Sequence, residues 1–179
     1  MLQKYKVTAF SLLLFIVSCL SPQSSKSEVV VPESLNPGQD QSLALVAAAK
    51  GVQIYECSVS DEQAGKYEWV NIAPKADLFD KNGNKIGKHY AGPHWESNDG
   101  SKVLGTVKEK VDAPLPGAVS WLLLSAKSDG PKGVFSEVTT IQRLNTVGGV
   151  APATGCSQAE VGKLAQSDYT ADYYLFTPK

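Results

Sequence analysis

The stretch 76–111 reads ADLFDKNGNKIGKHYAGPHWESNDGSKVLGTVKEKV and contains two turn signals, Asn82-Gly83 and Asp99-Gly100. Each signal lies between short strand-like runs. Asn-Gly and Asp-Gly favour tight hairpin turns, because these residues accept the positive φ angles that such turns require. We therefore expect two β-hairpins, with strands over 76–79, 85–90, 95–96 and 102–111.

Strand-like segments continue on both sides of this stretch. Residues 42–50 fit a short helix, because of their alanines, or a strand, because their apolar residues alternate, and we favour the strand. A helical turn is expected over 157–164, capped by Ser157 with Glu160 three residues later. Further strands are predicted over 51–60, 67–72, 118–126, 134–144 and 169–177, of which 118–126 is apolar on both faces and should be central.

These segments predict an all-β fold with about eight or nine mostly antiparallel strands in a single domain. The pattern fits a β-sandwich and a closed or flattened β-barrel equally well. We expect the β domain to cover 41–179 and a tether with an N-terminal arm to cover 19–40. Within the arm, 29–39 contains two prolines and should form an edge or covering segment.

The N-terminus indicates export. Two lysines precede an uninterrupted run of apolar and small residues over 7–17, which is typical of a secretory signal peptide and too short to span a membrane. The run ends in Ile16-Val17-Ser18-Cys19, which resembles a bacterial lipobox. This resemblance implies removal of 1–18, a diacylglycerol on Cys19 and an acylated amino group, which together give stable anchoring. The alternative is an ordinary signal peptide and a secreted protein.

The expected location is extracytoplasmic, with the chain anchored to the cell envelope and meeting the membrane through its N-terminal lipid. Leu20 follows the cysteine, where an Asp would argue for inner-membrane retention, so the outer membrane is favoured. The mature chain would lose two lysines and no acidic residue, which gives a net charge of 17 − 2 − 18 = −3. Because no run of Lys or Arg occurs, we expect no nucleic-acid partner.

The cysteine count agrees with export. If Cys19 carries lipid, Cys57 and Cys156 remain as a pair. Outside the cytoplasm the default for such a pair is a disulfide, and two buried free thiols are the alternative. A metal site is disfavoured, because neither cysteine has a second Cys or a His nearby in the sequence.

Several blocks of the chain occur in a characteristic order. They include GVQIYEC (51–57), APKADLFD (73–80), HYAGPHWE (89–96), IQRLNTVGG (141–149), APATGC (151–156) and YTADYY (169–174). In this order they resemble DUF3455, a family of uncharacterised secreted proteins of bacteria and fungi, over residues 50–177. The resemblance implies that Cys57 pairs with Cys156, and it implies no activity. The family usually has a residue other than histidine where this chain has His94.

The segment 89–101 gathers most of the candidate ligand-binding side chains. Together with the only arginine of the chain the candidates are His89, Tyr90, His94, Trp95, Glu96, Asp99 and Arg143. The two histidines are also metal candidates, since imidazole suits Zn²⁺ or Cu²⁺. In a regular strand they would face opposite sides, so only the turn at Gly92-Pro93 could bring them together. We expect no cofactor, and leave the metal as a hypothesis.

Carboxylate pairs suggest a second hypothesis, a hydrolase-like enzyme. Glu96 with Asp99, or Glu56 with Asp172, could act as general acid and base, although nothing in the sequence defines their separation. In a β domain, Arg143 is expected to pair with a buried carboxylate, Glu56 or Asp172, in preference to clamping an anionic ligand.

The leading hypothesis is a non-enzymatic envelope lipoprotein that binds a small molecule, a glycan or a protein partner. The aromatic residues could line a cleft for such a ligand, and they are Trp69, Trp95, Trp121, Tyr90 and those of 169–174. Trp121 is expected in the core. The alternatives are the hydrolase-like enzyme and a metal-binding protein that uses the 89–101 segment.

Overall fold

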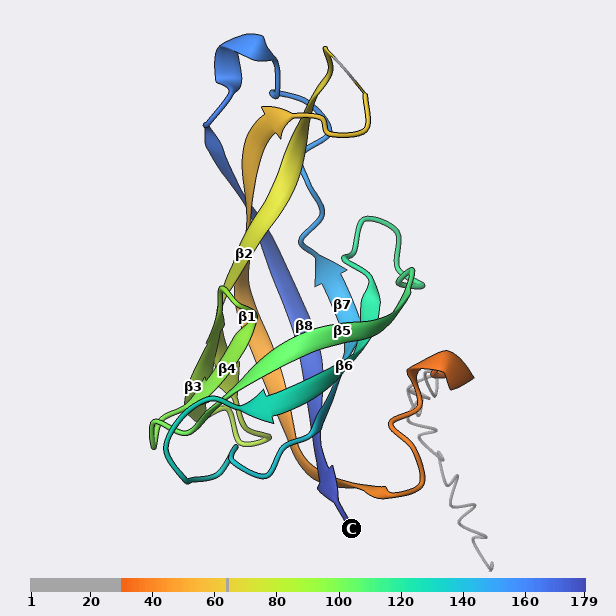
Figure 1. The fold of residues 1–179 in the computed structure, drawn as a ribbon, viewed down its shortest axis with the longest axis vertical. Coiled ribbons are helices and arrows are strands. Elements are labelled where there is room, and N and C mark those ends of the chain that lie inside the picture. The colour runs from red at the N-terminus through yellow and green to blue at the C-terminus, as the bar shows by residue number, and fades with distance from the viewer. Residues whose placement is uncertain (1–29, 64) are drawn as a thin grey trace, which may run out of the picture. The chain divides into compact units, whose positions relative to one another are not determined.

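Eight antiparallel strands form one sheet that closes on itself in the computed structural model (Figure 1). The structure describes residues 30–63 and 65–179, so the predicted signal peptide and Cys19 lie outside it. Each strand pairs with the next along the chain, and the last pairs with the first, which makes a closed barrel. The all-β prediction is therefore confirmed, and the closed alternative is the one observed.

The strands are β1 (Gln41–Val59), β2 (Tyr67–Phe79), β3 (Lys85–Tyr90), β4 (His94–Ser97), β5 (Lys102–Val111), β6 (Trp121–Ser128), β7 (Thr140–Gly148) and β8 (Leu164–Pro178). Two short 3₁₀ turns, η1 (Glu33–Leu35) and η2 (Gln158–Glu160), lie outside the sheet. The predicted hairpin turns join β2 to β3 and β4 to β5, and their glycines Gly83 and Gly100 have φ angles of 81° and 86°. Both hairpin predictions are confirmed.

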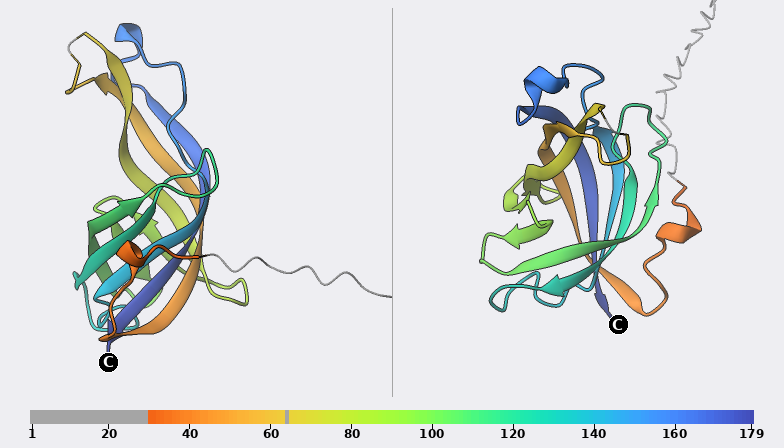
Figure 2. Two further views of the ribbon diagram at one scale, coloured as in Figure 1. Left: turned by 90° about the vertical axis from the view of Figure 1, so that its right-hand side faces the viewer. Right: turned by 45° about the horizontal axis from the view of Figure 1, so that its top comes forward.

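Two strands each join segments that the sequence pattern predicted as separate strands. β1 joins the two segments predicted over 42–50 and 51–60, and β2 joins those over 67–72 and 76–79. Gly51 lets these two strands approach, because a Cβ atom there would lie 2.1 Å from the carbonyl oxygen of Lys75. β1, β2 and β8 extend together beyond the shorter strands, as Figures 1 and 2 show.

The strand predicted over 134–144 is wrong in its first half. β7 begins at Thr140, and the preceding residues form a loop between β6 and β7. Phe135 and Val138 of this loop are buried in the main core cluster, and the N–H of Phe135 donates to Ser101 Oγ at 3.0 Å. The apolar residues that resembled a strand instead fill one end of the barrel.

The N-terminal arm covers the outside of the sheet. Leu35 is fully buried in a second apolar cluster with Trp121, Leu123 and Leu144, whereas the main cluster lies inside the barrel. Gln142 Nε2 donates to the carbonyl oxygen of Leu35 at 2.6 Å, which fastens the arm to β7. Trp121 is therefore a core residue, as expected, and lies outside the barrel interior.

The predicted disulfide is present between Cys57 in β1 and Cys156 in the loop before β8. The helical turn expected over 157–164 is also present, as η2, and Ser157 Oγ accepts from the N–H of Ala159 at 3.3 Å. In the described part of the chain, no helix has the length and hydropathy required to cross a membrane.

Candidate functional site

A cavity of about 690 Å³ lies inside the barrel. It opens at the end where the β3–β4, β5–β6 and β7–β8 connections lie, and residues from all three line it. The opposite end is filled by packed side chains that include Phe135. The volume falls within the range of about 300–1,000 Å³ typical of small-molecule sites.

Aromatic rings form one wall of this cavity. The β3–β4 register pairs His89 with Trp95, and both side chains face the interior. The two rings stack with centroids 4.2 Å apart, and Tyr173 of β8 meets them edge-on at 5.0 and 5.2 Å. His89 and Trp95 are only 3% and 1% exposed, so the contacts of neighbouring side chains hold both rings in place.

His89 is neutral in this environment. Burial lowers the pKa of His89 to about 3, so the ring carries one proton at neutral pH. That proton is on Nδ1, which lies 2.8 Å from the carbonyl oxygen of His94 and donates to it. Nε2 is then an acceptor, and it has no hydrogen-bond partner among residues 30–63 and 65–179.

Arg143 enters the cavity from β7, next to Tyr173 in the β7–β8 register. Its Nε and Nη2 both donate to the carbonyl oxygen of Ser120, at 3.0 and 2.8 Å. The expected ion pair with Glu56 or Asp172 is not formed, and that prediction is wrong. Asp172 and its neighbour Tyr173 lie on opposite faces of β8. The carboxylate of Asp172 accepts a hydrogen bond from Asn145 Nδ2 at 2.8 Å.

Three further polar side chains in the cavity were not among the predicted site residues. Tyr55 donates to the carbonyl oxygen of Gly149 at 2.6 Å, and Asn71 Nδ2 donates to Gln53 Oε1 at 3.0 Å. The period of a strand could have found two of them. Gln53, Tyr55 and the disulfide-bonded Cys57 are two residues apart in β1 and so share the inner face.

Several buried polar atoms at this site lack a partner. Gln53 Nε2, Trp95 Nε1 and Tyr173 OH have no hydrogen bond of normal geometry within the part of the chain that the structure describes. Burial raises the pKa of Tyr173, and the nearby charge of Arg143 partly offsets this rise. These atoms are buried behind the cavity surface, and the partly exposed Arg143 is the charged group that the inner lining presents to a ligand.

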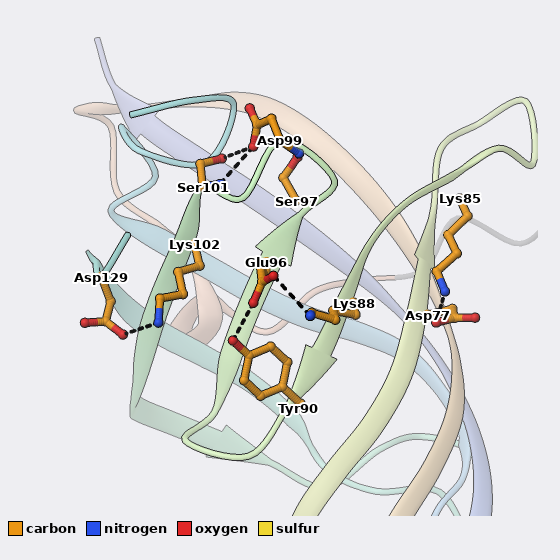
Figure 3. A network of polar contacts seen from close by, with 10 residues as sticks. All are labelled: Asp77, Lys85, Lys88, Tyr90, Glu96, Ser97, Asp99, Ser101, Lys102 and Asp129. Atoms are coloured by element: carbon orange, nitrogen blue, oxygen red, sulfur yellow. Dashed lines mark hydrogen bonds and ion pairs between the residues drawn. The ribbon is translucent and has the colours of Figure 1, made fainter. Parts of the chain in front are cut away.

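Tyr90, His94 and Glu96 point away from the cavity. Figure 3 shows Tyr90 and Lys88 pointing toward Glu96. Tyr90 OH donates to Glu96 Oε2 at 2.6 Å, and Lys88 Nζ lies 3.1 Å from Glu96 Oε1. The hydrogen bond to Glu96 raises the pKa of Tyr90 to about 12, and the same bond lowers the pKa of Glu96. His94 contacts Asp129, with 2.9 Å between Nε2 and Oδ2. These three side chains belong to a solvated surface network.

Asp99 lies in the turn between β4 and β5, beside Ser101 (Figure 3). Its carboxylate accepts hydrogen bonds from the N–H and Oγ of Ser101 at 2.9 and 2.6 Å and from the N–H of Val134 at 2.8 Å. The bond from the Ser101 hydroxyl is the largest cause that holds the pKa of Asp99 below its ordinary value. Asp99 thus fastens the β6–β7 loop to the β4–β5 turn.

Of the seven predicted ligand-binding residues, the structure brings together His89, Trp95 and Arg143 and places the other four elsewhere. Because His89 and His94 face opposite sides of the sheet, they do not converge on a common point. Among the described residues, no group of three or more His, Cys, Asp or Glu side chains could hold a metal ion. Glu96 and Asp99 likewise belong to separate networks.

Comparison with known proteins supports the resemblance found in the sequence. The model of DUF3455, described as a protein of unknown function, matches residues 37–177. Neither a search of curated proteins nor a search of solved structures finds a match. The family match includes all eight strands apart from the last residue of β8, and with it the whole lining of the cavity. The chain therefore belongs to the DUF3455 family.

Proposed function

We propose that this protein binds a small molecule inside the barrel. The observation that carries the proposal is the cavity of about 690 Å³, which Arg143 lines, in a barrel whose other end is packed. Protein interiors are close-packed and their buried polar groups are hydrogen-bonded, so an open, polar cavity of this size is suited to a ligand. A deep, concave site favours a small molecule over a protein partner.

Filling the cavity with a large side chain is expected to weaken the binding of a small-molecule probe. N-phenyl-1-naphthylamine is an uncharged probe that becomes fluorescent in apolar surroundings, and we expect it to bind the wild-type protein. Val119 lines the cavity, so Val119→Trp should weaken probe binding by at least about tenfold because the indole occupies the site. A fluorescence titration with the purified protein measures the effect.

Leu104→Trp is the matched control, because Leu104 lies on β5 opposite His94 on the outer face and is 37% exposed. It adds the same ring outside the cavity and should change the dissociation constant by less than about twofold. Equal binding by wild-type protein and Val119→Trp, with a native circular dichroism spectrum, would contradict a site inside the barrel. Absence of binding to the wild-type protein would contradict it as well.

We also propose that the protein is a lipoprotein of the cell envelope, tethered through Cys19. The lysines, the apolar run and the lipobox-like sequence that ends at Cys19 support this location. The Cys57–Cys156 disulfide supports it too, since structural disulfides are rare in the reducing cytoplasm of most cells. A tethered binding protein would hold its ligand close to the membrane surface.

Replacing Cys19 is expected to release the protein from the membrane. Wild-type protein expressed in a bacterium should incorporate labelled palmitate and sediment with membranes, whereas Cys19→Ser should do neither. Cys156→Ser serves as the control, because it removes a thiol and leaves the N-terminal signal intact. Palmitate label on the Cys19→Ser variant, or an unlabelled wild-type protein, would show that the protein is not anchored by a lipid on Cys19.

A further inference from the structure

The guanidinium of Arg143 has unused hydrogen-bonding capacity. An arginine side chain carries five N–H donors in one plane. The two hydrogen bonds from Nε and Nη2 end on a single acceptor, the carbonyl oxygen of Ser120. Three N–H donors, including both on Nη1, form no further hydrogen bond of normal geometry in the described segments, although the guanidinium lies near the Tyr173 hydroxyl. Arg143 forms no ion pair with a carboxylate in the same segments.

A cation without a counter-charge is unfavourable in a partly desolvated cavity. The carbonyl oxygen of Ser120 supplies a partial negative charge, whereas a paired carboxylate would supply a full one and accept two parallel hydrogen bonds. The chain places Asp172 on the outer face, with Asn145, so it does not provide that partner. The guanidinium is thus available to bind an anionic group of a ligand.

The remaining charges near the cavity restrict the ligand to one negative charge. Lys110 and Asp112 also line the cavity, but Lys110 is exposed and the opposite sign of Asp112 offsets its charge. His89 is buried and uncharged at neutral pH. Arg143 is therefore the only uncompensated charge among the lining residues, which suits a monoanion better than a dianion such as a phosphate monoester.

The apolar part of the lining indicates the shape of the ligand body. Leu122 of β6 and Val119 are partly exposed and provide aliphatic surface. The side chains of Trp95, Tyr173 and Leu124 are buried behind it. Arg143 and Leu122 are directly paired in the β6–β7 register, so cationic and apolar surfaces are adjacent. A ligand that spans them needs an acidic group attached to a compact apolar body.

We propose that the ligand is a small monocarboxylic acid with a compact apolar body, with its carboxylate on Arg143 and its body against Leu122 and Val119. This inference rests on the proposed binding function and specifies its ligand class. A carboxylate accepts a bidentate pair of hydrogen bonds from the free edge of the guanidinium.

Two isosteric probes test the ligand class. 2-Naphthoate and 2-naphthamide share one body and differ by one negative charge. By isothermal titration calorimetry at pH 7, we expect the wild-type protein to bind the acid about 10- to 100-fold more tightly than the amide, since hydrogen bonds between charged groups are the stronger ones. Arg143→Gln should bind both probes equally, within about threefold.

Two more variants separate the effect of the charge of Arg143 from the effects of its planar geometry and of other nearby cations. Arg143→Lys keeps the charge and loses the planar fork, so it should retain part of the preference for the acid. Lys110→Gln removes an exposed cation near the cavity and should retain all of it. Equal binding of acid and amide by the wild-type protein overturns the ligand class, as does a preference for the acid that survives in Arg143→Gln. If the uncharged naphthylamine still binds in either case, the proposed binding function stands and only this inference fails.

Discussion

Replacing both Cys57 and Cys156 by serine is expected to lower the free energy of unfolding by up to about 4.7 kcal/mol, the value that the chain-entropy model gives for a loop of about 100 residues. The two cysteines are 99 residues apart in the sequence, and the closed loop contains six complete strands, β2 to β7. Without the bridge, the unfolded chain regains the conformational freedom of all six strands.

The native contacts around the bridge are expected to survive its loss. Cys57 also pairs through its backbone with the β7–β8 loop, accepting from the N–H of Gly162 at 2.8 Å and donating to Lys163 at 2.9 Å. The Trp69 indole N–H donates to the carbonyl oxygen of Thr154 in the same loop. The double variant should therefore fold to the same barrel and unfold at a lower urea concentration.

Urea unfolding followed by circular dichroism, with and without dithiothreitol, measures this effect. Reductant should shift the midpoint of the wild-type protein and leave that of the Cys57→Ser/Cys156→Ser variant unchanged. A double variant that unfolds at the wild-type midpoint would show that the bridge contributes no stability. A reductant effect on the double variant would point to a cause other than this disulfide.

Trp95→Ala is expected to destabilise the protein by about 3–5 kcal/mol, the usual cost of removing a large aromatic side chain from a core. Trp95 is 1% exposed and belongs to the main core cluster. It stacks on His89 and contacts Tyr173, so its loss leaves both rings without their main neighbour. Gly105 of β5 packs against the indole, because a Cβ atom there would lie 2.6 Å from Trp95 Cζ3.

The comparison is with Trp69→Ala, which removes the same side chain from a partly exposed position on β2. The urea midpoints of the two variants, measured under oxidising conditions, should differ clearly, with Trp95→Ala much the lower. A stability loss in Trp95→Ala no larger than that in Trp69→Ala would mean that the ring is not part of the core. Trp95→Phe should recover part of the stability, because the phenyl ring fills part of the space of the indole.

The short turn motifs of the sequence predicted the two hairpins correctly, whereas composition and period predicted the bounds of the longer strands less well. The turns around Gly83 and Gly100 depend on a few residues with positive φ, so a short window of sequence contains the whole signal. Residues 134–139 have the composition of a strand, but Phe135 and Val138 are buried as part of a loop. Period and composition reveal that such residues are buried, and only the tertiary structure determines whether they form a strand.

The candidate site shows the same limit. Proximity in the sequence grouped His89, Tyr90, His94, Trp95, Glu96 and Asp99, yet alternation along β3 and β4 divides the first five between two faces. His89 and Trp95 could be assigned to one face once the hairpin register was known. The arrival of Arg143 from β7 and Tyr173 from β8 depends on closure of the sheet, which no local pattern encodes.

The claim that a ligand binds in the cavity against Arg143 is tested most directly by NMR. Arg143 is the only arginine of the chain, so its Nε–H gives a single arginine signal, beside the indole signals of three tryptophans. On titration with 2-naphthoate we predict that the Arg143 signal shifts, with the indole signals of Trp69 and Trp121 unchanged. A titration in which the acid binds but the Arg143 signal does not move would contradict the claim.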